Sequence, residues 1–253
     1  KRMKLYRYLL IAPLAAMAWA CSEDDPLPKP TIDFSNVPVE VGVEVMFDNL
    51  TTNADHYEWR FGNTGKTSTD VSPKVTFDAP GTMQVVLKAF TKDNQVDSVV
   101  RTVTIRQRYL TGYVVNVFPF KNDGVEWDDG EVGDDVYPDI LVQLLADNAD
   151  NLDNAYFDGP YSNVKVTDTP FSGTADTDVI LTNEDWGFAL FDFDGADINN
   201  ATNADFTFMT GVGFNPVAIP AIKNADGDAG YISVFFTDSN GNTIDVDLYF
   251  ELK

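Results

Sequence analysis

The sequence predicts an all-β protein made of two β-sandwich domains in tandem. Apolar and polar residues alternate with a period of two along many short segments, as is typical of strands that bury one face. Clusters of Gly, Pro, Asn and Asp separate these segments and predict turns. The acidic charge is shared unevenly, because residues 22–107 hold 13 acidic and 8 basic side chains whereas residues 108–253 hold 27 and 5. We therefore expect two domains of different surface chemistry.

Residues 1–20 are predicted to be a lipoprotein signal peptide. Four basic side chains lie within the first seven residues, and the apolar run that follows is too short to cross a hydrocarbon core of roughly 30 Å as a helix. Small residues then precede Cys21, the only cysteine of the chain. Bacterial lipoprotein signals place a cysteine directly after the cut, so we expect Cys21 to carry palmitate or similar acyl chains that anchor the protein. The alternative is an ordinary secretory signal followed by an unmodified cysteine.

Residues 21–30 are predicted to be the lipidated cysteine and an acidic, proline-rich tether. The run Ser22-Glu23-Asp24-Asp25 resembles the tag that sends lipoproteins of one Gram-negative phylum to the outer face of the outer membrane. We therefore expect an outer-membrane lipoprotein exposed at the cell surface, and the alternative is a lipoprotein that faces the periplasm. Without residues 1–20 the chain has a net charge of −27, which argues against binding to nucleic acid.

Residues 31–107 are predicted to form the first sandwich. Apolar alternation predicts strands over residues 41–47, 57–61 and 83–89, and turn residues divide the region into about seven short strands, the number typical of an immunoglobulin-like (Ig-like) fold. The segment Tyr57-Glu58-Trp59-Arg60-Phe61-Gly62-Asn63 and the later Pro80-Gly81-Thr82-Met83-Gln84-Val85 resemble the motifs of the polycystic kidney disease (PKD) domain. This resemblance implies a core position for Trp59 and a spacer or a protein- or carbohydrate-contact module outside the cell.

Residues 108–253 are predicted to form the second, more acidic sandwich. The Asn240-Gly241 pair predicts a hairpin with a tight primed turn between the last two strands. Nine segments have strand character: 109–120, 140–145, 163–166, 179–181, 186–193, 206–209, 217–219, 231–236 and 244–252.

Aspartates in this second domain gather in two loops. One loop precedes the strand that starts at residue 140, and the other follows the strand that starts at Trp186. Carboxylates from two loops suit Ca²⁺, which takes six to eight oxygen ligands in irregular geometry. The alternative is a solvated acidic surface in which Asp serves as a turn former. The candidate ligands are Asp123, Asp128, Asp134, Asp139, Asp192, Asp194 and Asp205.

The two aspartate-bearing segments resemble those of the C2 domain, which binds calcium and phospholipid. The matching residues are Asp139-Ile140-Leu141-Val142-Gln143-Leu144 and, later, Asp192-Phe193-Asp194 with Asp205. The resemblance implies that these four aspartates are ligands, together with one or more of the three in the earlier loop. Only five basic residues lie within 108–253, so any phospholipid contact would run through bound calcium.

These features together predict a non-enzymatic cell-surface lipoprotein that recognises a glycan or protein ligand, with calcium-dependent binding by its second domain. One alternative is a lipidated structural or accessory subunit of a larger surface assembly that handles glycans. Another is a glycan hydrolase that uses two carboxylates. The lone histidine, His56, has no nucleophile motif around it and is not expected to be catalytic.

Overall fold

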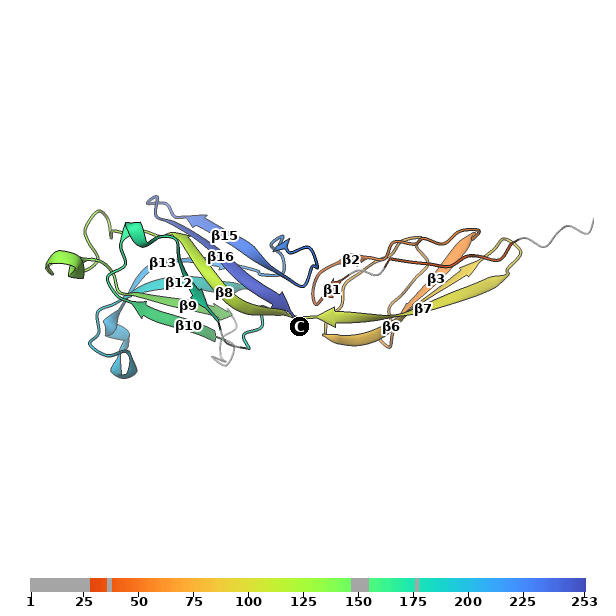
Figure 1. The fold of residues 1–253 in the computed structure, drawn as a ribbon, viewed down its shortest axis with the longest axis horizontal. Helices are drawn as coiled ribbons and strands as arrows, with labels where there is room; N and C mark the ends of the chain where they lie inside the picture. Colours follow the sequence, from red (N-terminus) through yellow and green to blue (C-terminus); the bar gives the residue numbers. More distant parts are fainter. Residues whose placement is uncertain (1–27, 36–37, 147–154, 176–177) are drawn as a thin grey trace, which may run out of the picture.

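The computed structural model describes residues 28–35, 38–146, 155–175 and 178–253, and it confirms an all-β protein of two tandem sandwiches (Figure 1). The predicted signal peptide, Cys21 and most of the tether lie outside the described residues. Within the described part of the chain, no helix is both long and apolar enough to span a membrane.

The first domain contains a five-stranded sheet in the order β1-β7-β6-β3-β4, and β2 pairs with β5 in a second, two-stranded sheet. All pairs in the larger sheet are antiparallel except β1 with β7, which is parallel. The strands are β1 (Val39–Glu40), β2 (Val45–Met46), β3 (His56–Phe61), β4 (Thr67–Ser68), β5 (Lys74–Val75), β6 (Gly81–Phe90) and β7 (Val96–Arg106).

Trp59 lies at the centre of the first core, as predicted. Its side chain is 1% exposed, its ring packs edge-on against Phe34, and its indole N–H donates to the carbonyl of Asp70. The expected strand over residues 41–47 is wrong for most of its length, because Gly42 adopts a left-handed φ of 78° and turns the chain, leaving only β2 as a strand.

The second domain packs two sheets face to face, in the orders β10-β9-β12-β13 and β11-β8-β16-β15-β14. Short 3₁₀ helices among the described residues of its loops are η1 (Gly133–Val136), η3 (Val166–Asp168), η4 (Ile198–Asn200) and η5 (Asn203–Asp205). Its strands are β8 (Arg108–Val117), β9 (Ile140–Ala146), β10 (Ala155–Tyr161), β11 (Phe171–Thr174), β12 (Trp186–Phe193), β13 (Phe206–Phe214), β14 (Ile222–Lys223), β15 (Ala229–Thr237) and β16 (Thr243–Leu252).

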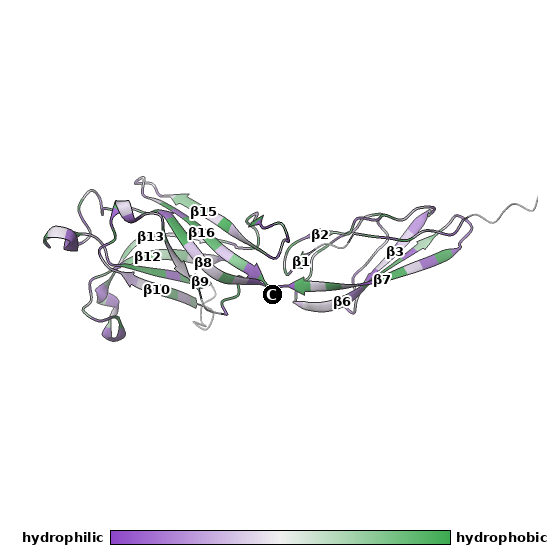
Figure 2. Ribbon diagram, in the orientation of Figure 1, coloured by the Kyte–Doolittle hydropathy of each residue, from purple (hydrophilic) through white to green (hydrophobic). Residues whose placement is uncertain are grey.

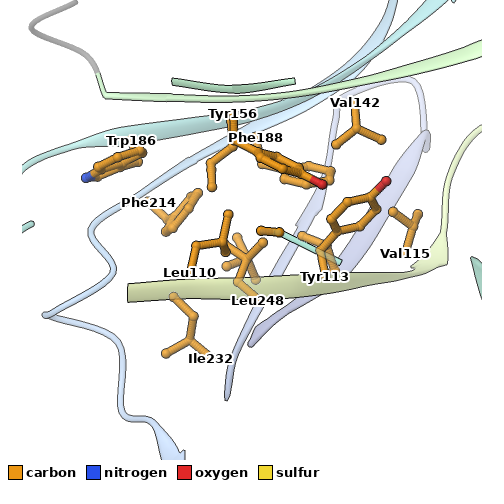
Figure 3. Packing of buried hydrophobic residues seen from close by; sticks show 14 of the residues in the cluster. Leu110, Tyr113, Val115, Val142, Tyr156, Trp186, Phe188, Phe214, Ile232 and Leu248 are labelled. Carbon is orange, nitrogen blue, oxygen red and sulfur yellow. The ribbon is translucent and has the colours of Figure 1, made fainter. Parts of the chain in front are cut away.

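The second core fills the space between these two sheets with side chains from alternate positions along each strand. Hydrophobic and hydrophilic residues alternate along the long strands in Figure 2. Figure 3 shows Leu110 and Tyr113 of β8 facing Tyr156 of β10 and Phe188 of β12, with Leu248 of β16 beside them. The two-residue period read from the sequence therefore places these side chains in one core.

Several predicted elements of the second domain are wrong. Residues 163–166, 179–181 and 217–219 form no ladder strand; Asn163, for example, has a φ of 54°, which is incompatible with an extended strand. Conversely, β10 and β11 were not predicted. The Asn240-Gly241 hairpin forms, but through a five-residue loop in which only Gly241 has positive φ, because the Asp238 side chain accepts hydrogen bonds from the backbone N–H groups of residues 240 and 242.

The two domains meet at a junction with a buried ionic contact. β7 runs into β8 with only Gln107 between them, and Gln107 exchanges two backbone hydrogen bonds with Lys253. Glu40, at the end of β1, accepts hydrogen bonds from Arg108 Nε at 2.7 Å and from Lys223 Nζ at 2.7 Å. Glu40 and Arg108 are each only 3% exposed, so this contact between the domains is shielded from water.

Candidate metal centre

Three aspartates from two loops meet at the tip of the second domain. Asp128 follows β8 in the chain, whereas Asp192 and Asp194 lie at and just beyond the end of β12. One carboxylate oxygen from each lies within 4.8 Å of the other two. The loops that carry them lie at the end of the second domain that faces away from the first domain (Figure 1).

The alternation of β12 explains why one of these carboxylates is buried. Phe188 and Leu190 point into the core, and Asp192 continues the same face of the strand, so its side chain is only 1% exposed. The backbone N–H of Asp139 donates to Asp192 Oδ1 at 2.9 Å. Asp194, two residues further on, lies just beyond the end of the strand and is exposed.

Burial and mutual repulsion disfavour ionisation of two members of the cluster. Burial raises the pKa of the Asp128 carboxyl to about 7, with further contributions from the charge on Asp192 and a hydrogen bond to Asp194. Burial also raises the pKa of Asp192 to about 6, and the charges of Asp194 and Asp139 add to this effect against the opposing hydrogen bond from the Asp139 N–H. Among the described residues, no Lys or Arg forms an ion pair with any of the three clustered carboxylates.

Asp139 lies next to this cluster and holds it in place. Its side chain accepts a hydrogen bond from the backbone N–H of Asn163 at 2.7 Å, while its own N–H holds Asp192. Its negative charge raises the pKa of both Asp128 and Asp192. Asp139 therefore positions the buried carboxylate. The supporting turn at Asn163 is left-handed, a conformation that Asn adopts more readily than most residues, although the sequence pattern predicted a strand there.

The other three predicted ligands do not join the cluster. Asp123 lies in a turn of its own, with a φ of 50°. Asp134 forms an ion pair with Lys165 at 2.6 Å. Asp205 accepts hydrogen bonds from the backbone N–H and hydroxyl of Thr202, which lower its pKa, and so its carboxylate caps η5.

A scan against protein-family models and a search of curated proteins gave no match. Solved structures similar to this chain include the PKD1 domain of Vibrio anguillarum Epp, at 22% identity over 31% of this chain and 94% of that one, with a TM-score of 0.28. The PKD1 domain of the Vibrio cholerae metalloprotease PrtV is 25% identical over 31% and 98% of the two chains, with a TM-score of 0.27.

A third similar structure belongs to the carbohydrate-binding modules of the β-sandwich superfamily, at 10% identity over 90% of this chain and 93% of that one, with a TM-score of 0.29. Since these TM-scores are all below 0.5, the likenesses support no conclusion about function. The fold class follows from the two pairs of sheets described above.

Proposed function

We propose that the protein is a surface-anchored, non-enzymatic recognition lipoprotein whose second domain binds calcium at its distal tip. One observation carries the calcium proposal: the buried Asp192 lies together with Asp128 and Asp194, and no described basic side chain pairs with them. Bringing carboxylates together and burying one of them costs free energy unless a cation balances their charge.

The donor set fits a hard divalent cation. Carboxylate oxygens of Asp128, Asp192 and Asp194, from two loops, would supply part of the six to eight oxygens that calcium takes. Asp139 serves as a positioning residue, because it holds Asp192 through its backbone. The resemblance to the C2 domain stays a prediction from the sequence, as does phospholipid contact through the bound ion.

Calcium should raise the thermal stability of the full chain. Extracellular calcium modules have dissociation constants of roughly 0.1–1 mM, so calcium at about ten to fifty times that value stabilises the domain by about 1.4–2.3 kcal/mol. This corresponds to a melting temperature about 3–10 °C above a chelator control at constant ionic strength. Magnesium should do much less, because it is smaller and dehydrates reluctantly.

Two variants with the same loss of charge make this test specific. Asp192→Asn should abolish the calcium-dependent increase, whereas Asp123→Asn should retain it, since Asp123 lies outside the cluster and Asn tolerates its positive φ. Equal melting temperatures in calcium and in chelator, with no heat released or absorbed on calcium titration, would show that the cluster is a solvated acidic surface that binds no calcium. Release of reducing ends from a glycan by the purified protein would contradict the non-enzymatic part of the proposal.

The membrane anchor is proposed from the sequence, because Cys21 lies outside the described residues. The described chain begins at residue 28, at the end of the first domain away from the junction, so the start of the described chain and the candidate metal centre lie at opposite ends of the described structure (Figure 1). Cys21→Ala should abolish metabolic labelling with palmitate and release the protein from the membrane fraction. Membrane association of wild-type protein without any label would argue against lipidation.

A further inference from the structure

The outer face of the sheet β10-β9-β12-β13 carries a groove of about 590 Å³, a size typical of ligand sites. The groove crosses the strands, from β10 over β9 and β12 to the loop that precedes β13. Its lining is mainly apolar and includes Leu141, Gln143, Phe157, Phe191, Asn203 and Phe206.

This face is apolar where a solvated sheet face is normally polar. Register places Leu141, Phe191 and Phe208 side by side on β9, β12 and β13, and the last is 60% exposed. In the adjacent row Phe157, 48% exposed, lies opposite Gln143, and Ala189 continues the row on β12. The exposed apolar residues therefore form one continuous surface.

One wall of the groove belongs to the loop that begins at the candidate metal centre. Asn203 of η5 and Ile198 of η4 line the groove, and both lie between Asp194 and β13. The backbone N–H of Asp194 donates to the carbonyl of Asp205 at 2.9 Å, which closes the base of this loop. An ion bound by Asp194 would therefore hold the base of the same loop that walls the groove.

The charges in and around the groove disfavour an anionic occupant. No Lys or Arg is among the lining residues, and the Asp158 carboxylate is engaged by the hydroxyls of Tyr113, Tyr156 and Tyr161. Residues 108–253 have a net charge of −22, which repels anions. The side-chain amides of Gln143 and Asn203 form no hydrogen bond with another described residue, and each offers both donors and an acceptor.

We propose that this groove binds a strand of neutral polysaccharide. Sugar rings present apolar C–H faces, which suit the phenylalanine rings, and hydroxyls that pair with amides in both directions. A lipid acyl chain would instead bury Gln143 and Asn203 without partners. The inference rests on the proposed recognition function and specifies its ligand class.

The test is affinity electrophoresis of the full chain in gels that contain soluble xyloglucan, galactomannan or laminarin, with polygalacturonate as an anionic comparison. At least one neutral polysaccharide should retard the protein, and polygalacturonate should not. Phe157→Ala and Gln143→Ala should each weaken binding by about tenfold. Phe235→Ala serves as the matched control, because Phe235 is 65% exposed on β15, in the opposite sheet, and its removal should leave binding unchanged.

Absence of retardation by all three neutral polysaccharides would overturn the inference, as would binding that Phe157→Ala does not change. Flotation with phosphatidylcholine vesicles that depends on Phe157 would overturn it in favour of a lipid. Gels run in calcium and in chelator separate this inference from the metal proposal. A calcium-dependent melting shift without retardation overturns only the groove, whereas retardation without that shift overturns only the metal centre.

Discussion

Asp192 occupies a position where the strand pattern calls for an apolar side chain. It continues the core-facing row of Phe188 and Leu190, yet it carries a carboxylate. Burial and neighbouring charges raise the pKa of this carboxylate. A residue that breaks the local pattern in this way marks a functional site when it lies among groups of the same kind. A bound cation would remove the free-energy cost of burying the ionised Asp192 carboxylate beside other carboxylates.

The raised pKa values of Asp128 and Asp192 predict an unusual pH dependence for the stability of the metal-free protein. The folded-state pKa values of Asp128 and Asp192, about 7 and about 6, lie above the unfolded value of roughly 3.9, so the folded state binds more protons between these limits. The free energy of unfolding should therefore fall as pH rises from 5 to 8, by on the order of 2 kcal/mol once solvent screening of the partly exposed Asp128 is taken into account.

Thermal melts in chelator at constant ionic strength check this prediction. Asp192→Asn should flatten the pH profile and raise the melting temperature at pH 8, whereas Asp123→Asn should leave the slope unchanged. A wild-type melting temperature that is constant or rises over this pH range would contradict the raised pKa values.

At the scale of elements, the sequence predicts the strands whose alternation of apolar and polar residues is unbroken. It misses strands whose alternation is interrupted and which are stabilised by contacts with residues far away in the sequence. β12 was predicted with its observed bounds, and the loops around it were predicted to carry ligand carboxylates. β10 was missed because Gly159 and Pro160 interrupt its pattern. In the structure, the Asp158 carboxylate of this strand accepts hydrogen bonds from Tyr113 of β8 and from Tyr156 and Tyr161 of β10 itself.

Contacts between segments far apart in the sequence also determine which residues form the candidate metal centre and the groove. Asp128 lies in a long irregular loop without periodicity, so the sequence alone could not separate it from Asp123 and Asp134. The groove could not be predicted from the sequence either, because alternation along one strand does not reveal that Phe191 and Phe208 lie opposite each other. Register between strands supplies this information, and only the folded chain contains it.

At the scale of the whole molecule, the buried contact of Glu40 with Arg108 and Lys223 fixes one domain against the other. Removing one partner of a buried ion pair leaves the other charge uncompensated, at a cost of about 3–5 kcal/mol. Glu40→Gln should therefore lower stability by about this amount and broaden the distribution of interdomain angles. Chemical unfolding measures the first effect, and small-angle X-ray scattering measures the second.

A matched surface pair provides the control for this prediction. Glu44 contacts Lys74 at 2.8 Å, but both side chains are largely exposed, so Glu44→Gln should cost only about 0–1 kcal/mol. Equal effects of the two substitutions would show that the junction contact contributes no more than an ordinary surface ion pair.

The parallel pairing of β1 with β7 determines how the molecule would carry tension between an anchored amino-terminal end and a ligand held at the tip. Pulling force enters β1 from its amino-terminal side and leaves β7 through β8, so it acts along the two strands in opposite directions. The hydrogen bonds between the strands are then loaded in shear and must break together, whereas peeling would break them one at a time. Under such tension the short ladder that joins residues 39 and 40 to residues 105 and 106 resists by shear, and the Glu40 contact with Arg108 and Lys223 passes part of the load directly to the second domain.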